Sequence, residues 1–474
     1  MVPTAENAHT EPFDLVVIGG GPAGYAAALY GASAGLDIAL VEKHKVGGTC
    51  LHVGCIPAKE LLETASVYRT VKGASAFGVV AGEPSLEWSV TLTRKQNIVD
   101  QLFKGLSGLL KGRKVTMFDG VGSLKADRTV RVSGGASGDV ELKGQYVLLA
   151  TGSVPRTIPG FDIDGELVVT SDELLSIPAL PERAVVIGGG AIGCEFASMM
   201  ADLGTKVTIL EALPKLLPGC DEDITNLVVR SFKKRSIDVR TGVIVSGHTP
   251  GPSGTKVSFG DGETIEVDLV VIAVGRRPHT DGLGLDGTAV KLTDRGYIDV
   301  DKYCRTAEPN VFGAGDVIAT PALAHVGFAE GILVAKQILG DDPLPIDYSR
   351  VPWCIYCHPE VAFTGLSEQQ AKEAGFDVVV SKHRFIGNGR ALIVGEPDGM
   401  VKIIAEKQAD GTGGRILGVH MVGPWVTEQL GQAYLSVNWE ATVAEVAEFI
   451  WPHPTMSELF GESVLALTGR SLHG

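Results

Sequence analysis

Several features that mark other classes of protein are missing from this chain of 474 residues. No stretch of eighteen uncharged apolar residues occurs, so no membrane span is predicted. Basic residues are not in excess: the net charge is -15, which argues against a nucleic-acid-binding surface. The start, MVPTAENAHTEPF, lacks the basic and apolar regions of a signal peptide, and we interpret it as a short disordered tail.

Cysteine is also scarce, with seven residues spread over the whole chain. An odd, scattered set differs from the dense paired cysteines of a secreted disulfide scaffold. We therefore expect a cytoplasmic protein in which any disulfide is catalytic. Hydrophobic residues make up 45% and charged residues 20%, as in ordinary globular proteins, and the length predicts about three domains.

Glycine, by contrast, is abundant, and its spacing near the start of the chain is informative. An apolar strand precedes Gly19-x-Gly21-x-x-Gly24, and a helix and a second strand then lead to Glu42. In a dinucleotide-binding fingerprint the first glycine makes the turn and the second lets the backbone approach a pyrophosphate. The third lets helix pack on strand, and the acid binds ribose hydroxyls.

The same pattern recurs in the middle of the chain. Gly188-x-Gly190-x-x-Gly193 also lies between a strand and a helix, and the next strand ends in Glu211. One such motif is weak evidence, and two glycine-rich turns without a ligand are the alternative. Two copies, each with its acid at the same distance, predict two dinucleotide sites.

The rest of the chain completes an α/β fold. Apolar segments over 146–153, 269–278 and 310–316 read as strands ending in glycine, which indicates doubly wound sheets. From about residue 347, alternating segments predict an antiparallel sheet followed by helices. We predict two Rossmann-like dinucleotide-binding domains and a C-terminal α+β dimerisation domain. The expected boundaries are 1–152 and 277–346 for the first dinucleotide-binding domain, 153–276 for the second and 347–474 for the last.

Cys50 and Cys55 form a candidate redox pair just after the first fingerprint. In an ideal helix this separation is roughly 8 to 9 Å, whereas a disulfide needs Cα atoms within about 7 Å. The pair can therefore close only if the segment is distorted, which Gly54 and Pro57 permit. A helix start is also expected to lower a thiol pKa. From spacing alone, two ordinary buried cysteines remain the alternative.

The segment GGTCLHVGCIPAK over 47–59 is very similar to the active-site segment of the flavoprotein disulfide reductases, the class I pyridine nucleotide-disulfide oxidoreductases. ATGS, AVGRRP, FGAGD, LAH and HPTMSE follow in the family's order, so the resemblance covers nearly the whole chain. It implies FAD and NAD as cofactors and a redox-active Cys50–Cys55 disulfide. It also implies that Lys59 lies beside the flavin with Glu195 as its partner.

The resemblance further assigns binding residues to each cofactor. The FAD site would comprise Gly19, Gly21, Gly24, Glu42, Thr49, Lys59, Gly122, Thr151, Gly152, Ser153, Asp316, Ala324 and His325. The NAD site would comprise Gly188, Gly190, Gly193, Glu211, Val243 and Gly275.

His453 and Glu458 resemble the family's acid–base pair, which activates a substrate thiol. In the family this pair reaches the disulfide of the other subunit, so the resemblance implies a homodimer with shared active sites. Thr455-x-x-Glu458 also fits a helix capping box, and both roles are open.

The nucleotide and the substrate can be narrowed further. Glu211 would accept hydrogen bonds from ribose hydroxyls and repel a 2′-phosphate, and Ala212, Leu213 and Pro214 supply no arginine, so NAD is favoured over NADP. CIPAK is closer to the CIPSK of family members that oxidise dihydrolipoyl groups than to the CVPKK of glutathione reductases. The expected partners are then lipoyl domains of 2-oxo acid dehydrogenase complexes or of the glycine cleavage system. An NADH-dependent reductase of another disulfide or of quinones, and a non-enzymatic flavoprotein, are the alternatives.

Cys354-x-x-Cys357-His358 fits the c-type haem motif, but its surroundings look like the first strand of the family's interface domain. A zinc site would lack a second ligand cluster. We interpret these cysteines as buried strand residues and predict no metal site.

The chain also departs from the family pattern. Ala58 replaces a serine, His52 an asparagine and Trp451 a histidine, and His279 stands where asparagine is common. After His325 the chain reads Val-Gly-Phe-Ala in place of the usual Lys-Ala with acids. We expect Trp451 to affect the substrate mouth and the stretch after His325 to affect flavin tuning.

Overall fold

The computed structural model describes residues 11–135 and 138–473, so the expected N-terminal tail lies almost wholly outside the described residues. The chain forms two compact units. Unit 1 comprises Met1–Glu60, Ser89–Arg156 and Gly275–Tyr348, and unit 2 comprises Leu61–Trp88, Thr157–Val274 and Ser349–Gly474. The finer division predicted from the sequence, with boundaries at 152, 276 and 346, stays a prediction. Within the described ranges no helix is both long and apolar enough to cross a membrane.

Unit 1 is built on a five-stranded parallel sheet. Its strands, in spatial order, are β18 (Val311–Gly313), β7 (Gly144–Leu149), β1 (Phe13–Ile18), β2 (Ile38–Glu42) and β3 (Thr116–Asp119). Leu15, Val16 and Val17 are fully buried, because both faces of such a sheet are covered. The parallel arrangement confirms the doubly wound sheet expected from the sequence.

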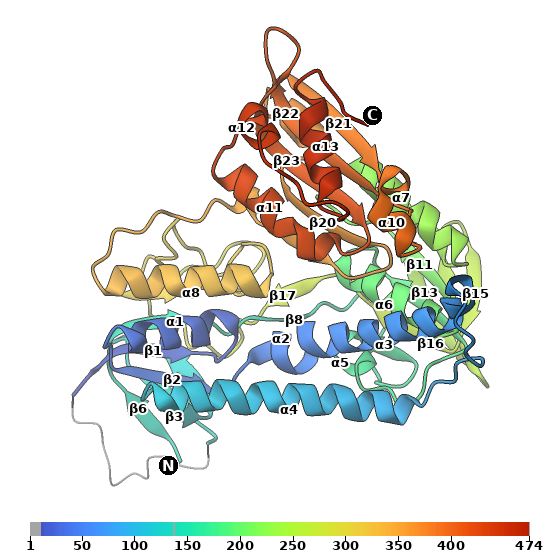
Figure 1. Ribbon diagram of the computed structural model, residues 1–474. Helices are drawn as coiled ribbons and strands as arrows, with labels where there is room; N and C mark the ends of the chain where they lie inside the picture. The colour runs from blue at the N-terminus through green and yellow to red at the C-terminus, as the bar shows by residue number, and fades with distance from the viewer. Residues whose placement is uncertain (1–10, 136–137, 474) are drawn as a thin grey trace. The chain divides into compact units, whose positions relative to one another are not determined.

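Helices α1 (Pro22–Ser33) and α8 (Ala324–Ile338) pack closely in unit 1 (Figure 1). Two glycines on α8 allow this approach. A Cβ atom at Gly331 would lie 2.2 Å from the Ala23 carbonyl oxygen, and one at Gly327 would lie 3.3 Å from the Ala23 nitrogen. The start of α1, which carries the first fingerprint, is therefore held by α8. The other unit 1 elements are α2 (Gly48–Val53), α4 (Trp88–Gly112, whose first residue belongs to unit 2), β4 (Val121–Leu124), β5 (Val130–Ser133), β6 (Val140–Leu142), β8 (Ser153–Pro155) and β17 (Arg276–Pro278). Helix α3 (Cys55–Gly73) begins in unit 1 and continues in unit 2.

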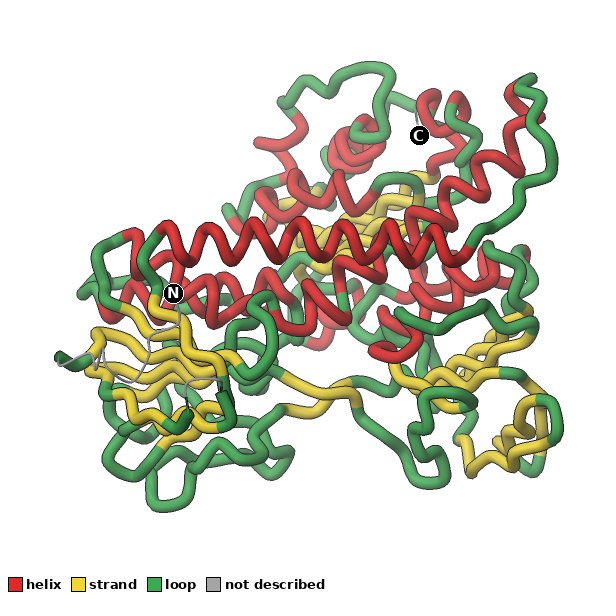
Figure 2. Tube along the Cα trace, turned by 90° about the horizontal axis from the view of Figure 1, so that it is seen from below, coloured by secondary structure: helices red, strands yellow, loops and turns green. Residues whose placement is uncertain are grey.

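Unit 2 contains a second parallel sheet and an antiparallel one, whose strands are yellow in Figure 2. The parallel sheet has the order β12 (Asp238–Thr241), β11 (Lys206–Glu211), β10 (Arg183–Ile187), β16 (Leu269–Ile272) and β9 (Val168–Thr170). The antiparallel sheet has the order β19 (Trp353–Ile355), β20 (Glu360–Gly365), β23 (Gly413–Gly423), β22 (Met400–Lys407) and β21 (Val378–Arg384). The antiparallel sheet predicted from residue 347 onward is thus confirmed. The helices of unit 2 are α5 (Ser171–Leu174), α6 (Ala191–Asp202), α7 (Glu222–Lys234), α9 (Glu368–Glu373), α10 (Gly389–Ile393), α11 (Val426–Asn438), α12 (Val443–Ala447) and α13 (Glu458–Ala466).

Three small antiparallel sheets of the described residues were not predicted from the sequence. Two lie in unit 1, β4–β5–β6 and β8–β17, and one in unit 2, formed by β13 (Val245–Gly251), β14 (Gly254–Phe259) and β15 (Glu263–Val267). Their strands are short, and only the alternation of buried and exposed residues, as at Val130 and Val132, signals them.

A row of paired residues crosses the large antiparallel sheet. The pairs run from Trp353 to Phe363, to His420, to Lys402 and to Lys382. The Trp353 and Phe363 rings are stacked with centroids 5.7 Å apart, and the Phe363 and His420 rings with centroids 5.2 Å apart. Burial lowers the pKa of His420 to about 4, so this imidazole is neutral. Its Nδ1 accepts a hydrogen bond from the Asp221 backbone N–H at 3.2 Å.

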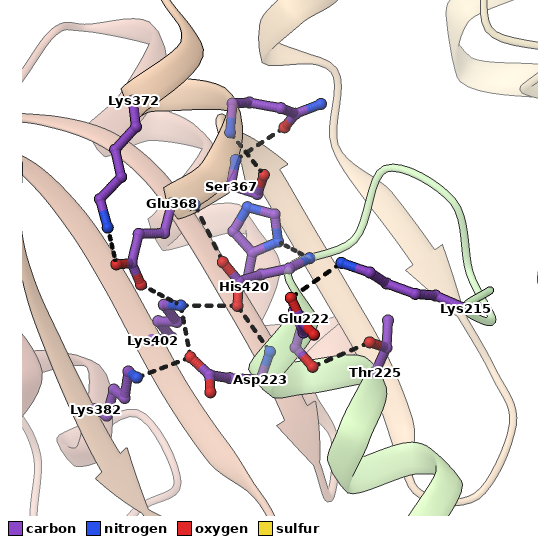
Figure 3. A network of polar contacts seen from close by, with 12 residues as sticks. Lys215, Glu222, Asp223, Thr225, Ser367, Glu368, Lys372, Lys382, Lys402 and His420 are labelled. Carbon is purple, nitrogen blue, oxygen red and sulfur yellow. Dashed lines mark hydrogen bonds and ion pairs between the residues drawn. The ribbon is translucent and has the colours of Figure 1, made fainter. Parts of the chain in front are cut away.

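Lys402 in this row is a buried cation surrounded by three carboxylates (Figure 3). Its Nζ lies 2.8 Å from Asp221 Oδ1, 2.6 Å from Asp223 Oδ2 and 2.8 Å from Glu368 Oε2. Burial opposes the charge on Lys402, but these hydrogen bonds outweigh it and raise the pKa of the ammonium group. Because Asp221 is the N-cap of α7, the cluster fixes the start of that helix on the antiparallel sheet.

Lys402→Met tests the weight of this cluster. The variant leaves the buried carboxylate of Asp221 without its cation, so the free energy of unfolding should fall by about 3 to 5 kcal/mol. Denaturant titration measures this loss. Lys372→Met is the matched control, because it removes an exposed Glu368–Lys372 pair on one helix, which should contribute no more than about 0.5 kcal/mol. Equal losses in the two variants would contradict the assignment.

Candidate active site and dinucleotide sites

The segment between Cys50 and Cys55 is a broken helix. Helix α2 ends at Val53 and α3 begins at Cys55, with Gly54 between them at φ −149° and ψ −114°. A Cβ atom at Gly54 would lie 2.8 Å from the Thr49 carbonyl oxygen, so the break needs glycine. The distortion expected from the spacing of the two cysteines is therefore confirmed, and Gly54 causes it.

The two cysteines interact across this break. Both are half-buried thiols in this structure, and Cys50 hydrogen-bonds to Cys55. That bond, with burial, raises the pKa of the Cys50 thiol, while the charge of Lys59 acts in the opposite direction. The expected lowering by a helix start is thus wrong for Cys50. Two thiols in contact do not readily both ionise, because the second proton leaves a group beside an existing negative charge.

Tyr25 is a neighbour of this pair that the sequence analysis missed. Burial, together with the nearby Cys50 and Cys55, raises the pKa of Tyr25 to about 12. Tyr25 directly follows the third glycine of the first fingerprint, on α1. No motif in the sequence marks Tyr25 as a neighbour of the two cysteines.

The first fingerprint has the geometry of a ligand site. Gly19 has φ +106°, and a Cβ atom there would lie 2.3 Å from the Ala150 carbonyl oxygen. A Cβ atom at Gly24 would lie 1.9 Å from the Gly19 carbonyl oxygen, so Gly24 serves close packing of α1. At Gly21 the nearest atom would be 3.9 Å away. The protein itself therefore leaves room for a side chain at Gly21, which fits the close approach of a pyrophosphate.

The second fingerprint repeats this geometry. A Cβ atom at Gly188, whose φ is +112°, would lie 2.3 Å from the Ala273 carbonyl oxygen. A Cβ atom at Gly193 would lie 2.0 Å from the Gly188 carbonyl oxygen. No protein atom lies within 4 Å of a Cβ atom at Gly190. The residues present thus fit a dinucleotide at both turns.

Glu42 and Glu211 occupy matching positions and make matching contacts. Glu42 accepts hydrogen bonds from the backbone N–H of Gly20 at 2.8 Å and of His44 at 2.9 Å. Glu211 accepts from the N–H of Gly189 at 2.5 Å and of Leu213 at 2.6 Å. Each carboxylate therefore shapes its own turn, and each oxygen keeps further lone pairs with which a ribose hydroxyl could bond.

Several of the residues predicted to bind FAD form one hydrogen-bond network in unit 1. Ser153 Oγ donates to Asp316 Oδ2 at 2.6 Å and accepts from Arg276 Nε at 2.7 Å. Thr151 Oγ1 donates to the His279 carbonyl oxygen at 2.6 Å. Arg276 and His279 were not predicted as site residues. The AVGRRP motif contains Arg276 and directly precedes His279.

The remaining residues predicted to bind FAD lie on elements around this network. Gly122 is buried on β4 beside Ile18, and Gly152 has φ +72° and accepts a hydrogen bond from the His279 N–H. Thr49 lies on α2, with Oγ1 3.5 Å from Arg276 Nη2. Ala324 and His325 are the first two residues of α8.

Glu330 on α8 supports the turn that carries Asp316. It is fully buried, accepts the Gly315 N–H at 2.6 Å and the Tyr348 hydroxyl at 3.0 Å. Burial raises the pKa of Glu330 to about 7, against the effect of these hydrogen bonds. Glu330 was not predicted as a site residue, because no motif in the sequence marks it.

The residues predicted to bind NAD do not all fall in one unit. Gly188, Gly190, Gly193, Glu211 and Val243 belong to unit 2, where the Val243 N–H donates to the Glu211 carbonyl oxygen at 3.0 Å. Gly275, with φ +100°, is the first residue of the last segment of unit 1.

His453 and Glu458 are paired in unit 2. His453 Nδ1 lies 2.6 Å from Glu458 Oε1, and the other carboxylate oxygen accepts the Thr455 N–H at 2.7 Å. The His453 side chain is 77% exposed. The capping box is wrong, because Thr455 Oγ1 donates to the Pro452 carbonyl oxygen and α13 begins at Glu458 itself.

Lys59 and Glu195 lie in different units. Lys59 is on α3, near enough to Cys50 to oppose the rise of its pKa. Glu195 is buried on α6, and its Oε1 accepts the Tyr356 N–H at 2.9 Å. Their pairing stays a prediction.

The interpretation of the CxxCH cysteines as buried strand residues is correct only in part. Cys354 lies on β19 and is half-buried, whereas Cys357 is buried just beyond the strand, with its thiol 3.2 Å from the Pro359 carbonyl oxygen. Burial lowers the pKa of His358 to about 3. Among residues 11–135 and 138–473, no three His, Cys, Asp or Glu side chains are grouped as metal ligands.

Comparison with known proteins places these features in a family. Residues 13–331 match the family model described as pyridine nucleotide-disulphide oxidoreductase, and residues 351–464 match that family's dimerisation domain. A dihydrolipoyl dehydrogenase of Bacillus subtilis is 41% identical, with 97% of this chain and 99% of the relative covered. One from Zymomonas mobilis is 38% identical, with the same coverage of both chains.

Solved structures share the fold. The structure of LpdA from Mycobacterium tuberculosis matches with a TM-score of 0.89 at 25% identity, covering 96% of this chain and 99% of that one. The HOCl-induced flavoprotein disulfide reductase RclA from Escherichia coli, as its Cu(II) complex, matches with a TM-score of 0.86 at 26% identity, covering 96% of this chain and all of that one.

Gly190→Ala separates a ligand role from a packing role at the second fingerprint. Gly190 has φ −74°, which alanine adopts, and the new Cβ meets no protein atom. Stability should therefore change by less than about 0.5 kcal/mol, while NAD⁺ binding measured by calorimetry should weaken by about tenfold or more. Gly193→Ala should instead lower the free energy of unfolding by about 1 to 3 kcal/mol through its backbone clash. Unchanged NAD⁺ affinity in Gly190→Ala would refute the assignment.

Glu330→Gln should remove a pH dependence of stability. A raised pKa means that Glu330 contributes stability in its protonated form, present below about pH 4.5 and lost as pH rises through about 7. The wild type should therefore lose roughly 3 kcal/mol relative to Glu330→Gln between pH 4 and pH 9. Urea titrations of both FAD-loaded proteins at the two pH values give the difference. A constant difference would show that Glu330 ionises without penalty.

Proposed function

We propose that this chain, which belongs to the pyridine nucleotide-disulphide oxidoreductase family, is a dihydrolipoyl dehydrogenase that oxidises protein-bound dihydrolipoamide and reduces NAD⁺. The observation that carries the proposal is the pair of thiols of Cys50 and Cys55, in hydrogen-bond contact across the helix break at Gly54. Relatives named dihydrolipoyl dehydrogenase cover nearly the whole chain and support the substrate.

The dithiol supplies the first half of the chemistry. A substrate thiol, deprotonated by His453, attacks the Cys50 sulfur of the disulfide, and Cys55 leaves as a thiolate. The second substrate thiol then attacks the first substrate sulfur in this mixed disulfide, which closes the lipoyl disulfide and releases Cys50 as a thiolate. Two electrons pass to the cysteine pair, and His453 accepts and returns the protons.

The remaining residues hold the cofactors. Gly19, Gly21, Gly24, Glu42 and the Ser153–Asp316 network would hold FAD, and the turn at Gly188–Gly193 with Glu211 would hold NAD. Bound FAD would supply the electron transfer from the dithiol to NAD⁺. Lys59 lies where its charge favours a thiolate at the Cys50–Cys55 pair.

The finer assignments belong to the same proposal. The match to a dimerisation domain supports a homodimer, in which the exposed His453 of one copy would face Cys50 of the other. Lipoyl domains of a 2-oxo acid dehydrogenase complex, or of the glycine cleavage system, would supply the substrate arm. A cytoplasmic location accords with this function.

Anaerobic titration of the purified FAD-loaded protein with dihydrolipoamide tests the proposal. The dithiol should form with a long-wavelength absorbance band from a thiolate beside the flavin, and later NAD⁺ should yield NADH in stoichiometric amount. Cys55→Ser should abolish both responses, because it cannot form the internal disulfide. A wild-type flavin spectrum that responds to NADH and ignores dihydrolipoamide would instead favour a reductase of another disulfide or of quinones.

A further inference from the structure

The loop that carries His453 has little support from the imidazole itself. The His453 side chain is 77% exposed, and its pairing with Glu458 joins it to the same loop. The position of this base must therefore be set by whatever holds the loop backbone over 451–458. Two contacts hold this backbone, one at each end of the proline-containing stretch.

The first contact is the packing of Trp451. Its indole packs against Phe460 on α13 with ring centroids 5.4 Å apart and an interplanar angle of 64°. A Cβ atom at Gly461 would lie 2.3 Å from Trp451 Cδ1, so the ring fills the space that this glycine leaves open. Trp451 thus contributes to the core of the C-terminal sheet and helices. The expected effect of Trp451 on the substrate mouth stays a prediction.

The second contact is a hydrogen bond from Asn388, which lies between Phe385 and α10. Its side chain is buried, and its amide is used at both ends: Oδ1 accepts the Ala391 N–H at 2.9 Å, and Nδ2 donates to the Thr455 carbonyl oxygen at 2.9 Å. Because one partner is a donor and the other an acceptor, only one orientation of the amide satisfies both.

The backbone before Asn388 is held in place by Phe385. The Phe385 ring is fully buried between two glycines: a Cβ atom at Gly399 would lie 2.7 Å from Phe385 Cδ2, and one at Gly423 would lie 2.7 Å from Phe385 Cε2. The Asn388 N–H also donates to the Phe385 carbonyl oxygen at 2.8 Å. The hydrogen bond from Asn388 to Thr455, called the tether below, therefore links the catalytic loop to the antiparallel sheet.

Thr455 connects the tether to the proposed catalytic base, His453. Its carbonyl oxygen is held by Asn388, and its N–H is held by Glu458 Oε2 at 2.7 Å, while Glu458 Oε1 meets His453. A shift of Thr455 would hence move Glu458 and turn the imidazole. Displacements of about 1 Å in such a constellation can lower rates by up to about a hundredfold.

We propose that Asn388 is a positioning residue that fixes the His453–Glu458 pair through the Thr455 backbone. The inference rests on the proposed function, which makes His453 the base. Asn388 does not touch the substrate or the cofactors; it acts through the loop.

Three substitutions separate the tether from the helix cap. Asn388→Ser keeps a cap for α10 but is too short to reach Thr455, and Asn388→Asp keeps the cap but turns a carboxylate oxygen toward the Thr455 carbonyl. Asn388→Ala loses both contacts. Thr442→Ala is the matched control, because it removes the cap of α12 in the same unit without contacting the loop.

Two reactions of each FAD-loaded variant are compared across pH. Oxidation of dihydrolipoamide should fall by about tenfold or more in the Ser and Asp variants, with a displaced pH limb for the base and little change in KM. Reduction of ferricyanide by NADH, which needs neither the dithiol nor His453, should stay at the wild-type rate. Thr442→Ala should match the wild type in both reactions.

A substrate-independent measurement keeps this test separate from the proposed function. After reduction with NADH, alkylation of Cys50 by iodoacetamide should show a displaced pH dependence in Asn388→Ser. If the wild type ignores dihydrolipoamide, the proposed function fails, whereas the alkylation result still judges Asn388. Wild-type turnover and alkylation profiles in Asn388→Ser, or parallel loss of the ferricyanide reaction, would overturn the inference.

Discussion

Both dinucleotide turns depend on one interaction: a carboxylate at the end of the second strand accepts the N–H that follows the first glycine. Glu42 does this for Gly20 and Glu211 for Gly189. The bond orients the turn, so that the N-terminus of the following helix is left open for an anion. In unit 1 the helix that follows this turn, α1, is in turn held by α8, which packs on its start.

The active pair depends on a second constraint, the helix break at Gly54. Without it, Cys50 and Cys55 would lie too far apart on one helix to exchange a disulfide. The break brings the two thiols into contact and also makes their ionisation interdependent. One thiolate beside one thiol is the state that such a pair favours when reduced, which suits a nucleophile and its leaving group on neighbouring residues.

Features set by local sequence were predicted well. The two fingerprints, the strands around them, the distortion between the cysteines and the C-terminal antiparallel sheet follow from periodicity and glycine spacing. Features that depend on distant partners were not. Lys402 is 181 residues from Asp221, and Asn388 is 67 residues from Thr455, so neither contact leaves a local pattern. The pKa of Cys50 rises, contrary to the expectation from a helix start, because the hydrogen bond to the partner thiol of Cys55 has the largest effect on it.

Trp451 illustrates the same limit at a single position. It stands where the family often has a histidine, two residues before the catalytic one, and was therefore expected to affect the substrate mouth. Its ring fills the space above Gly461, ten residues further along the chain, which the local sequence did not indicate. The replacement therefore acts on the support of the loop, and a small residue at 461 is its structural counterpart.

The unusual stretch after His325 can be interpreted in the same way. Gly327 lets α8 approach Ala23, and the Phe328 ring contacts Tyr25, with centroids 5.5 Å apart. Tyr25 in turn is close enough to Cys50 and Cys55 for their charges to raise its pKa. Phe328 thus places an uncharged aromatic ring beside Tyr25. The hydrogen bond to Cys55 and burial raise the pKa of the Cys50 thiol, and the positive charge of Lys59 opposes them, so the dithiol itself has more influence on the ionisation of Cys50 than the neighbouring side chains do.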